Sequence, residues 1–193
     1  METTIPQFGI IGNGELGSAL GGALTKKGEQ VLFYDRLPDR TTTASIEDLV
    51  RSCPVLLLCI PSWEAKGVAR QIAKASHPGE ERLVVTLSKG VEKGFVTMDA
   101  LLKETLPKAF DIGVLYGPMI AEEIARGRRG AGVLAVSDTK WFHPLRYSLS
   151  QAGITIEASG DLHGVALCAV LKNIYAIAFG VSEGKHLGLN SKG

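Results

Sequence analysis

The stretch Phe8-Gly-Ile-Ile-Gly12-Asn-Gly14-Glu-Leu-Gly17 decides the fold of this chain. Its apolar first part predicts a buried strand, and the pattern G-x-G-x-x-G follows directly, where a helix then begins. In this context Gly12 permits a tight turn, Gly14 lets a pyrophosphate approach the backbone, and Gly17 allows close packing of helix on strand. The N–H groups at the helix start favour bound phosphate. Residues 12–17, the glycine loop, therefore predict a dinucleotide site, with packing alone as the alternative.

Apolar runs alternate with helical patterns along the rest of the chain. Most runs are apolar at every position, which is typical of strands buried on both faces of a parallel sheet. The predicted strands are Phe8–Ile11, Gln30–Tyr34, Val55–Ile60, Leu83–Leu87, Gly113–Tyr116, Val133–Val136 and Ile154–Ile156. The predicted helices are Leu16–Lys27, Ser45–Arg51, Ser62–Ala75, Met98–Leu106, Ile120–Arg126 and Thr139–Gln151. This order predicts an α/β fold of the Rossmann type, with a doubly wound, mostly parallel sheet.

The length of 193 residues allows one complete domain and part of a second. We expect a dinucleotide-binding domain over residues 1–160 and part of a second domain over residues 161–193. Within the second part, residues 165–181 are apolar apart from Lys172 and Asn173, and these two polar residues argue against a membrane span. The segment instead predicts a long apolar helix in the second part of the chain.

Composition argues against several other classes of protein. The 21 basic and 20 acidic side chains leave a net charge of +1, which provides no general field for nucleic acid or anionic lipid. The cysteines Cys53, Cys59 and Cys168 are odd in number and lack C-x-x-C spacing, which disfavours a disulfide framework and a metal site. The N-terminus has no basic and apolar leader. We therefore expect a cytoplasmic protein without a nucleic-acid partner and without a metal.

Asp35 and Arg36, at the end of the second predicted strand, bear on the choice of cofactor. A carboxylate at this position accepts hydrogen bonds from both ribose hydroxyls of NAD and repels the 2′-phosphate of NADP. An arginine beside the acid stacks on adenine or, with the acid turned away, pairs with that phosphate. The expected cofactor is NAD, and NADP remains the alternative.

Three more segments follow predicted strands, namely Ile60-Pro61-Ser62, Leu87-Ser88-Lys89-Gly90 and Tyr116-Gly117-Pro118-Met119. Ligands bind at the carboxyl ends of parallel strands, so these segments are expected to face the same crevice as the glycine loop. Lys89 is the charged residue at the end of its strand, and the glycine after it gives it room to reach inward. A solvated surface lysine is the equal alternative.

Lys172 lies in the middle of the long apolar helix, which we expect to be buried in a full-sized protein because it is apolar all round. A buried ammonium group is costly unless it pairs, hydrogen-bonds or loses its proton. Withdrawal from water would suit Lys172 to acid–base chemistry near neutral pH. Asn173 offers a donor and an acceptor about 100° round the same helix. The alternatives are that Lys172 reaches solvent or forms a structural pair with a carboxylate.

Together these motifs resemble the NAD(P)-dependent glycerol-3-phosphate dehydrogenase family, in the superfamily of 6-phosphogluconate dehydrogenase. The resemblance covers almost the whole chain, and its most specific part is Leu171-Lys-Asn-Ile-Tyr-Ala176 with Gly180 and Gly188 after it. It implies hydride transfer between NAD(P)H and C2 of dihydroxyacetone phosphate or sn-glycerol 3-phosphate, which supplies phospholipid synthesis. It also implies a phosphorylated small-molecule substrate, and it implies that residues 161–193 contain the first long helix of an all-α domain that is incomplete in this chain.

The resemblance implies a role for each motif. Lys172 would give or take the proton at the C2 oxygen, and Lys89 would be a second catalytic residue that contacts cofactor and substrate. Gly117 and Asn173 would also bind substrate. The implied cofactor-binding residues are Gly12, Asn13, Gly14, Glu15, Leu16, Gly17, Asp35, Arg36, Pro61, Lys89 and Ala121.

Two other functions stay open. One is a non-catalytic NAD-binding module, which is favoured by Met119 because the family commonly has a serine or asparagine there. The other is a reductase of the same superfamily that acts on another phosphorylated or carboxylated ketone. A helix as apolar as residues 165–181 would be partly uncovered without the rest of its domain, so we expect association with another copy or with other elements, and a homo-oligomer is the expected assembly.

Overall fold

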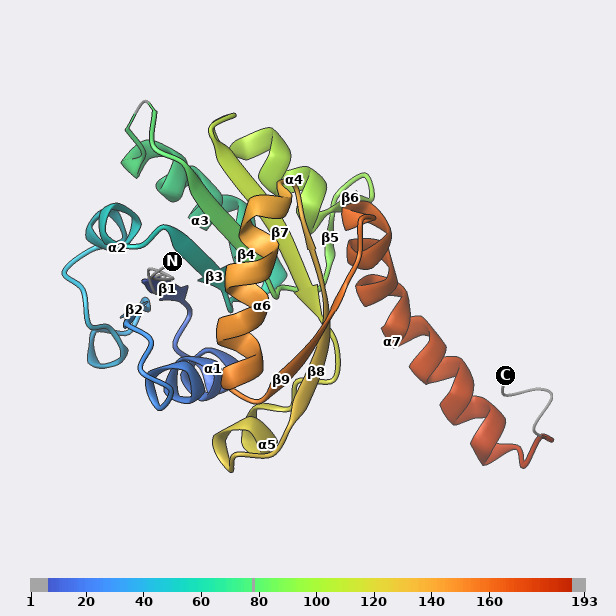
Figure 1. The fold of residues 1–193 in the computed structure, drawn as a ribbon. Helices are drawn as coiled ribbons and strands as arrows, with labels where there is room; N and C mark the ends of the chain where they lie inside the picture. The colour runs from blue at the N-terminus through green and yellow to red at the C-terminus, as the bar shows by residue number, and fades with distance from the viewer. Residues whose placement is uncertain (1–6, 78, 189–193) are drawn as a thin grey trace.

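The computed structural model describes residues 7–77 and 79–188 (Figure 1). One sheet of seven strands has the order β2-β1-β3-β4-β7-β8-β9, and all neighbours are parallel except the antiparallel pair β7 and β8. The strands are β1 (Phe8–Ile11), β2 (Val31–Tyr34), β3 (Val55–Leu58), β4 (Arg82–Thr86), β7 (Phe110–Tyr116), β8 (Gly130–Val136) and β9 (Ile154–Ala158). The predicted α/β fold with a mostly parallel sheet is confirmed.

Helices cover both faces of this sheet (Figure 1). They are α1 (Glu15–Thr25), α2 (Ile46–Ser52), α3 (Ser62–Ala75), α4 (Met98–Thr105), α5 (Ala121–Ala125), α6 (Phe142–Gln151) and α7 (Leu162–Gly184), with short 3-10 turns η1 (Pro38–Arg40) and η2 (Thr139–Trp141). The predicted helix over residues 139–151 is therefore divided, because Asp138 accepts a hydrogen bond from Lys140 N–H and caps the short turn first. A small hairpin of β5 (Val91–Glu92) and β6 (Val96–Thr97) was not predicted.

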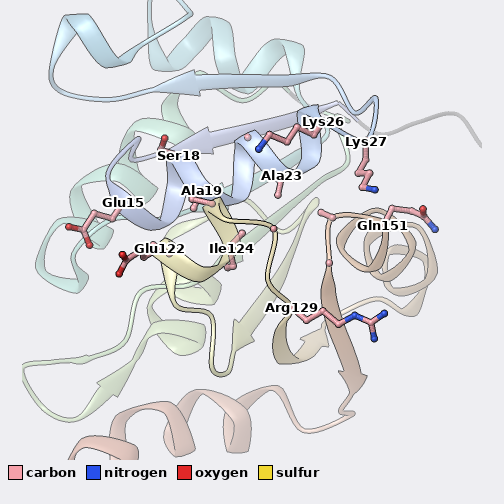
Figure 2. Close-up of a pocket in the computed structure, with 16 residues that line it drawn as sticks. Glu15, Ser18, Ala19, Ala23, Lys26, Lys27, Glu122, Ile124, Arg129 and Gln151 are labelled. Atoms are coloured by element: carbon pink, nitrogen blue, oxygen red, sulfur yellow. The ribbon is translucent and has the colours of Figure 1, made fainter.

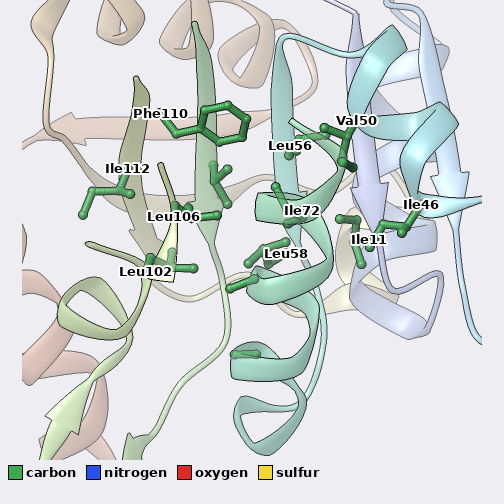
Figure 3. Packing of buried hydrophobic residues seen from close by; sticks show 14 of the residues in the cluster. Ile11, Ile46, Val50, Leu56, Leu58, Ile72, Leu102, Leu106, Phe110 and Ile112 are labelled. Carbon is green, nitrogen blue, oxygen red and sulfur yellow. The ribbon is translucent and has the colours of Figure 1, made fainter. Parts of the chain in front are cut away.

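The alternation of side chains along each strand separates two hydrophobic clusters. Ile11 packs on the face covered by α2, α3 and α4, which Figure 3 shows from close by. Ile10 packs on the other face, beneath α1, α5 and α6. Both residues are buried, and each such side chain contributes roughly 1.5–3 kcal/mol. Burial on both faces explains why these strands are apolar at every position.

Helix α7 begins against β7 and β8 and then runs away from the sheet (Figure 1). Its buried residues are Ala166, Ala169 and Ser182, whereas residues 172–181 are exposed. In this chain Lys172 and the outer part of the helix are exposed, as expected of a helix without the rest of its domain, because only the first turns of α7 meet the sheet. Among the described residues, α7 is the one helix long and apolar enough to cross a membrane, a criterion that core helices also meet.

Candidate functional site

The register of three parallel strands brings the glycine loop, Asp35 and Cys59 to one edge of the sheet. Ile11 of β1 lies opposite Tyr34 of β2 and Leu58 of β3, so the residues that follow these three lie side by side. Because β1 lies between β2 and β3, the winding of the chain reverses at this point. Such a reversal opens the crevice in which α/β proteins bind their ligands.

Each of the three glycines in the loop is required, or favoured, for a different structural reason. Gly12 has φ +95°, and a Cβ there would lie 2.5 Å from the carbonyl oxygen of Cys59. A Cβ on Gly17 would overlap the carbonyl oxygen of Gly12, so this glycine is required for packing. A Cβ on Gly14 would meet no described atom within 4 Å, and α1 starts there without a side-chain cap. The open space before Gly14, at a helix N-terminus, therefore fits the phosphates of a dinucleotide.

Asp35 is attached to the glycine loop. Its carboxylate accepts hydrogen bonds from the N–H of Asn13 at 2.7 Å and of Leu37 at 3.0 Å. Asn13 in turn donates from its amide nitrogen to the carbonyl oxygen of Arg40 at 2.7 Å. Each carboxylate oxygen retains a further lone pair. The acid therefore shapes the loop and can still accept bonds from a ligand.

Arg36 is directed toward helix α3 and pairs there with Glu64 at 3.0 Å. The arginine side chain is largely exposed, and such surface pairs are worth about 0–1 kcal/mol. The pair therefore holds Arg36 only weakly.

A second part of the edge forms a pocket of about 590 Å³ that two lysines line. Lys89 follows β4, Gly117 follows β7, and Lys172 lies on α7, so the fold unites residues from three predicted motifs. Burial, and secondly the positive charge of Lys172, lower the pKa of Lys89. The pocket is also lined by Asp161, whose carboxylate accepts the Gly164 N–H at 2.7 Å, and the two ammonium groups leave an excess of positive charge that favours an anionic ligand. Asn173, by contrast, is exposed and is not part of this lining.

Tyr116 positions the segment that carries Lys89, and sequence reasoning did not identify this role. Its hydroxyl donates a 2.6 Å hydrogen bond to the carbonyl oxygen of Ser88, and Ser88 Oγ donates to the carbonyl oxygen of Ile60 at 2.6 Å. Burial raises the pKa of Tyr116, so the hydroxyl keeps its proton. In the sequence Tyr116 ends an apolar run and looks like an ordinary core residue.

Four other predicted cofactor or loop residues lie around the crevice in less direct positions. Pro61 is exposed just before α3, and Leu16 packs against the core beneath α1. Glu15 and Ala121 line a separate hollow of about 760 Å³ on the face formed by α1 and α5 (Figure 2). Their contacts with a cofactor remain predictions.

The glycine loop, the acid after β2 and the lysine pocket define a dinucleotide-binding protein of the Rossmann class. The model of the NAD-dependent glycerol-3-phosphate dehydrogenase N-terminus matches residues 39–142, and the model of the C-terminus of the same enzyme matches residues 161–193. The chain belongs to the NAD-dependent glycerol-3-phosphate dehydrogenase family. The resemblance inferred from the motifs is thereby confirmed.

Known proteins agree with this assignment. The chain is similar to glycerol-3-phosphate dehydrogenase [NAD(P)+] of Acinetobacter baumannii, with 31% identity over 99% of this chain and 59% of the relative. The enzyme of that name from Gluconobacter oxydans is 32% identical over 98% of this chain and 63% of its own length. The chain thus spans about three fifths of these curated relatives.

Solved structures show the same fold. The crystal structure of glycerol-3-phosphate dehydrogenase from Coxiella burnetii matches with a TM-score of 0.81 and 23% identity, over 97% of this chain and 64% of that one. The Plasmodium falciparum glycerol-3-phosphate dehydrogenase matches with a TM-score of 0.84 and 17% identity, over 97% and 61% of the two chains.

Proposed function

We propose that this chain forms the cofactor-binding part, and the first substrate-domain helix, of an enzyme that reduces dihydroxyacetone phosphate to sn-glycerol 3-phosphate or catalyses the reverse reaction. The observation that carries the proposal is the pocket that Lys89 and Lys172 line at the carboxyl edge of the sheet. A phosphorylated ketone is the anionic substrate such a pocket suits. The names of the curated relatives support this substrate.

The glycine loop and Asp35 would hold the cofactor. Bound NAD(H) supplies or accepts the hydride. The backbone before Gly14 leaves room for the pyrophosphate, and the Asp35 carboxylate would accept hydrogen bonds from the ribose hydroxyls. The same negative charge would repel a 2′-phosphate, so we propose a preference for NAD over NADP. Further proposed contacts come from Gly12, Asn13, Glu15, Leu16, Gly17, Arg36, Pro61, Lys89 and Ala121.

The two lysines would act on the substrate oxygen. As hydride reaches C2 of the ketone, negative charge develops on the oxygen, and ammonium groups fixed nearby stabilise it. Lys172 would give its proton to that oxygen to form the alcohol and take it back in the reverse direction. Lys89 would contact both cofactor and substrate, and its lowered pKa is consistent with the electrostatic proximity of Lys172. Gly117 and Asn173 are proposed further substrate contacts.

The exposed side of α7 is proposed to be covered in the assembled protein. Ile174, Tyr175 and Ile177 are each at least 61% exposed, and such an apolar surface is typical of an interface. We place the boundary between the dinucleotide-binding domain and the helical domain at residue 160. The cover for α7 would come from other elements of the helical domain or from a second copy, and the compartment would be the cytoplasm.

An assay of NADH oxidation with dihydroxyacetone phosphate tests the function. We would compare this chain with a version extended by the remaining C-terminal region of the Acinetobacter baumannii relative. Turnover in the extended protein supports the proposal. NADH binding without turnover of any ketone would favour the non-catalytic module, and turnover of a different phosphorylated or carboxylated ketone would favour the related reductase.

A further inference from the structure

A polar contact joins the first turn of α7 to the start of α4. His163 Nδ1 lies 3.1 Å from Asp99 Oδ2 and 3.3 Å from Thr97 Oγ1. Asp99 and Thr97 are buried, at 7% and 2% exposure, whereas the His163 side chain is 64% exposed. The contact therefore connects an accessible residue of the helix to a buried carboxylate of the dinucleotide-binding part.

The burial of Asp99 makes this contact costly to lose. Its second carboxylate oxygen, Oδ1, is buried and has no hydrogen-bond partner among the described residues. Among the described residues, His163 is the one basic side chain with a nitrogen within 4.0 Å of the Asp99 carboxylate. A buried carboxylate that loses its partner leaves an uncompensated charge, which is destabilising. The start of α7 is thus bound to α4 by more than packing.

The apolar contacts of α7 with the sheet come from its first turns. The fully buried residues Ala166 and Ala169 join it to Val114, Tyr116 and Ala135 of the sheet, and the partly buried residues Leu162 and Val165 of the same first turns pack against this cluster. Alanine side chains bury little apolar area, so they contribute less than larger residues would. After these first turns, the helix runs into solvent (Figure 1). The direction of its outer part therefore depends on contacts made near its beginning.

Lys172 lies beyond these contacts. It is nine positions after His163, which corresponds to about 14 Å along the helix and about 180° around it. A tilt or rotation of α7 that separates His163 from Asp99 consequently moves Lys172 relative to Lys89 in the pocket. The position of Lys172 relative to Lys89 therefore depends on a contact made on the opposite side of the helix, between His163 and Asp99.

We propose that His163 and Asp99 are positioning residues. Their contact fixes the first turn of α7 on α4 and thereby places the Lys172 ammonium group opposite Lys89. The importance of this placement for hydride transfer rests on the proposed function, whereas the placement itself does not.

Two measurements on the 193-residue chain test the proposal without substrate or turnover. Hydrogen exchange of the amides over residues 164–170 reports the docking of α7. A short bifunctional amine reagent, followed by mass spectrometry, reports the proximity of Lys89 and Lys172. Neither hydrogen exchange nor cross-linking requires dehydrogenase activity. A chain that lacks this activity would contradict the proposed function, but it would leave the test of the His163–Asp99 contact intact.

The informative variants are His163→Leu and His163→Asn, with His143→Leu on α6 as the matched control. Loss of a hydrogen bond to a charged group predicts roughly tenfold faster exchange in His163→Leu. The same variant should lose most of the Lys89–Lys172 cross-link. Asparagine can present an N–H near the position of Nδ1, so His163→Asn should have an exchange rate and a cross-link yield close to those of the unsubstituted chain. Because His163 is mostly exposed, we expect the fold to tolerate these changes.

Asp99→Asn keeps the volume of the buried side chain and removes its charge. We expect faster exchange and a weaker cross-link in this variant as well. It serves as the second test if His163→Leu does not fold. Exchange and cross-linking that stay at the level of the His143→Leu control in His163→Leu would overturn the proposal. So would faster exchange with an unchanged cross-link, because docking would then not determine the placement of Lys172. Failure of His163→Asn to recover either measurement would also contradict it.

Discussion

The Oδ2 atom of Asp35 lies 2.7 Å from the backbone nitrogen of Asn13 and accepts its N–H. The acid at the end of β2 is thus joined to the glycine loop that follows β1. One carboxylate shapes the phosphate-binding backbone and, in the proposed function, recognises the ribose. The two roles make Asp35 the most informative position in the cofactor site.

Asp35→Asn should weaken NADH binding by roughly 10- to 100-fold, because it replaces a charged hydrogen-bond acceptor by a neutral one. The variant should also lose part of its preference for NADH over NADPH, since the charge that repels the 2′-phosphate is absent. Fluorescence titration with both cofactors measures the two effects. Asp39→Asn, an exposed acid in η1, is the control. Unchanged affinity for NADH in Asp35→Asn would show that the carboxylate does not contact the cofactor.

Alanine substitutions at two glycines should separate folding from binding. Gly17→Ala places a Cβ against the Gly12 carbonyl oxygen and should lower the free energy of unfolding by about 1–3 kcal/mol. Gly14→Ala has open space and should change it by less than about 1 kcal/mol, yet weaken NADH binding. Urea unfolding and cofactor titration give the two quantities. Equal losses of stability in both variants would contradict this division.

The charge of Lys172 should be detectable at Lys89. Because burial and the neighbouring ammonium both lower the pKa of Lys89, this side chain loses its proton at a lower pH than an ordinary lysine. Lys172→Met removes the second cause, so the pKa of Lys89 should rise but remain below the ordinary value. NMR titration of labelled lysine side chains measures it. Lys185→Met, just after α7, should leave Lys89 unchanged; an identical effect of both variants would refute the proximity of the pair.

The three thiols should differ in reactivity. Burial raises the pKa of Cys53 and of Cys59 to about 12, whereas Cys168 is exposed on α7. Alkylation at neutral pH should therefore modify Cys168 first and reach the other two only after unfolding, because the thiolate is the reactive form. Peptide mapping after timed exposure to iodoacetamide measures this order. Early labelling of Cys53 comparable to that of Cys168 would contradict the buried position of the Cys53 thiol.

Local sequence patterns predicted the elements that are buried on two faces. Strands such as β3 are apolar at every position because helices cover both faces of the sheet. The glycine pattern predicts a dinucleotide site because it lies between a strand and a helix. The hairpin of β5 and β6 escaped prediction because its strands are two residues long. Its turn depends on left-handed backbone at Gly94 and Phe95.

Other features could not be predicted because they depend on partners distant in the chain. Helix α7 contacts the sheet only near its start, which leaves Lys172 exposed, and the extent of this contact depends on the sheet and not on the apolar pattern of the helix. His163 and Asp99 are 64 positions apart, and Tyr116 and Ser88 are 28 apart, so neither contact has a local signature. Lys89 and Gly117 were expected at one edge because each follows a parallel strand, whereas Lys172 lies on α7 and its place in the same pocket was implied by the family resemblance alone.

The most direct test of the central claim is the turnover of Lys172→Met in the extended protein, with dihydroxyacetone phosphate and NADH. Removal of the proposed proton donor should lower turnover by roughly 100-fold or more, the size expected for general acid catalysis. The dissociation constant for NADH should stay within about twofold, because the glycine loop and Asp35 would carry that binding. Turnover close to that of the unsubstituted extended protein would contradict the proposed role of Lys172.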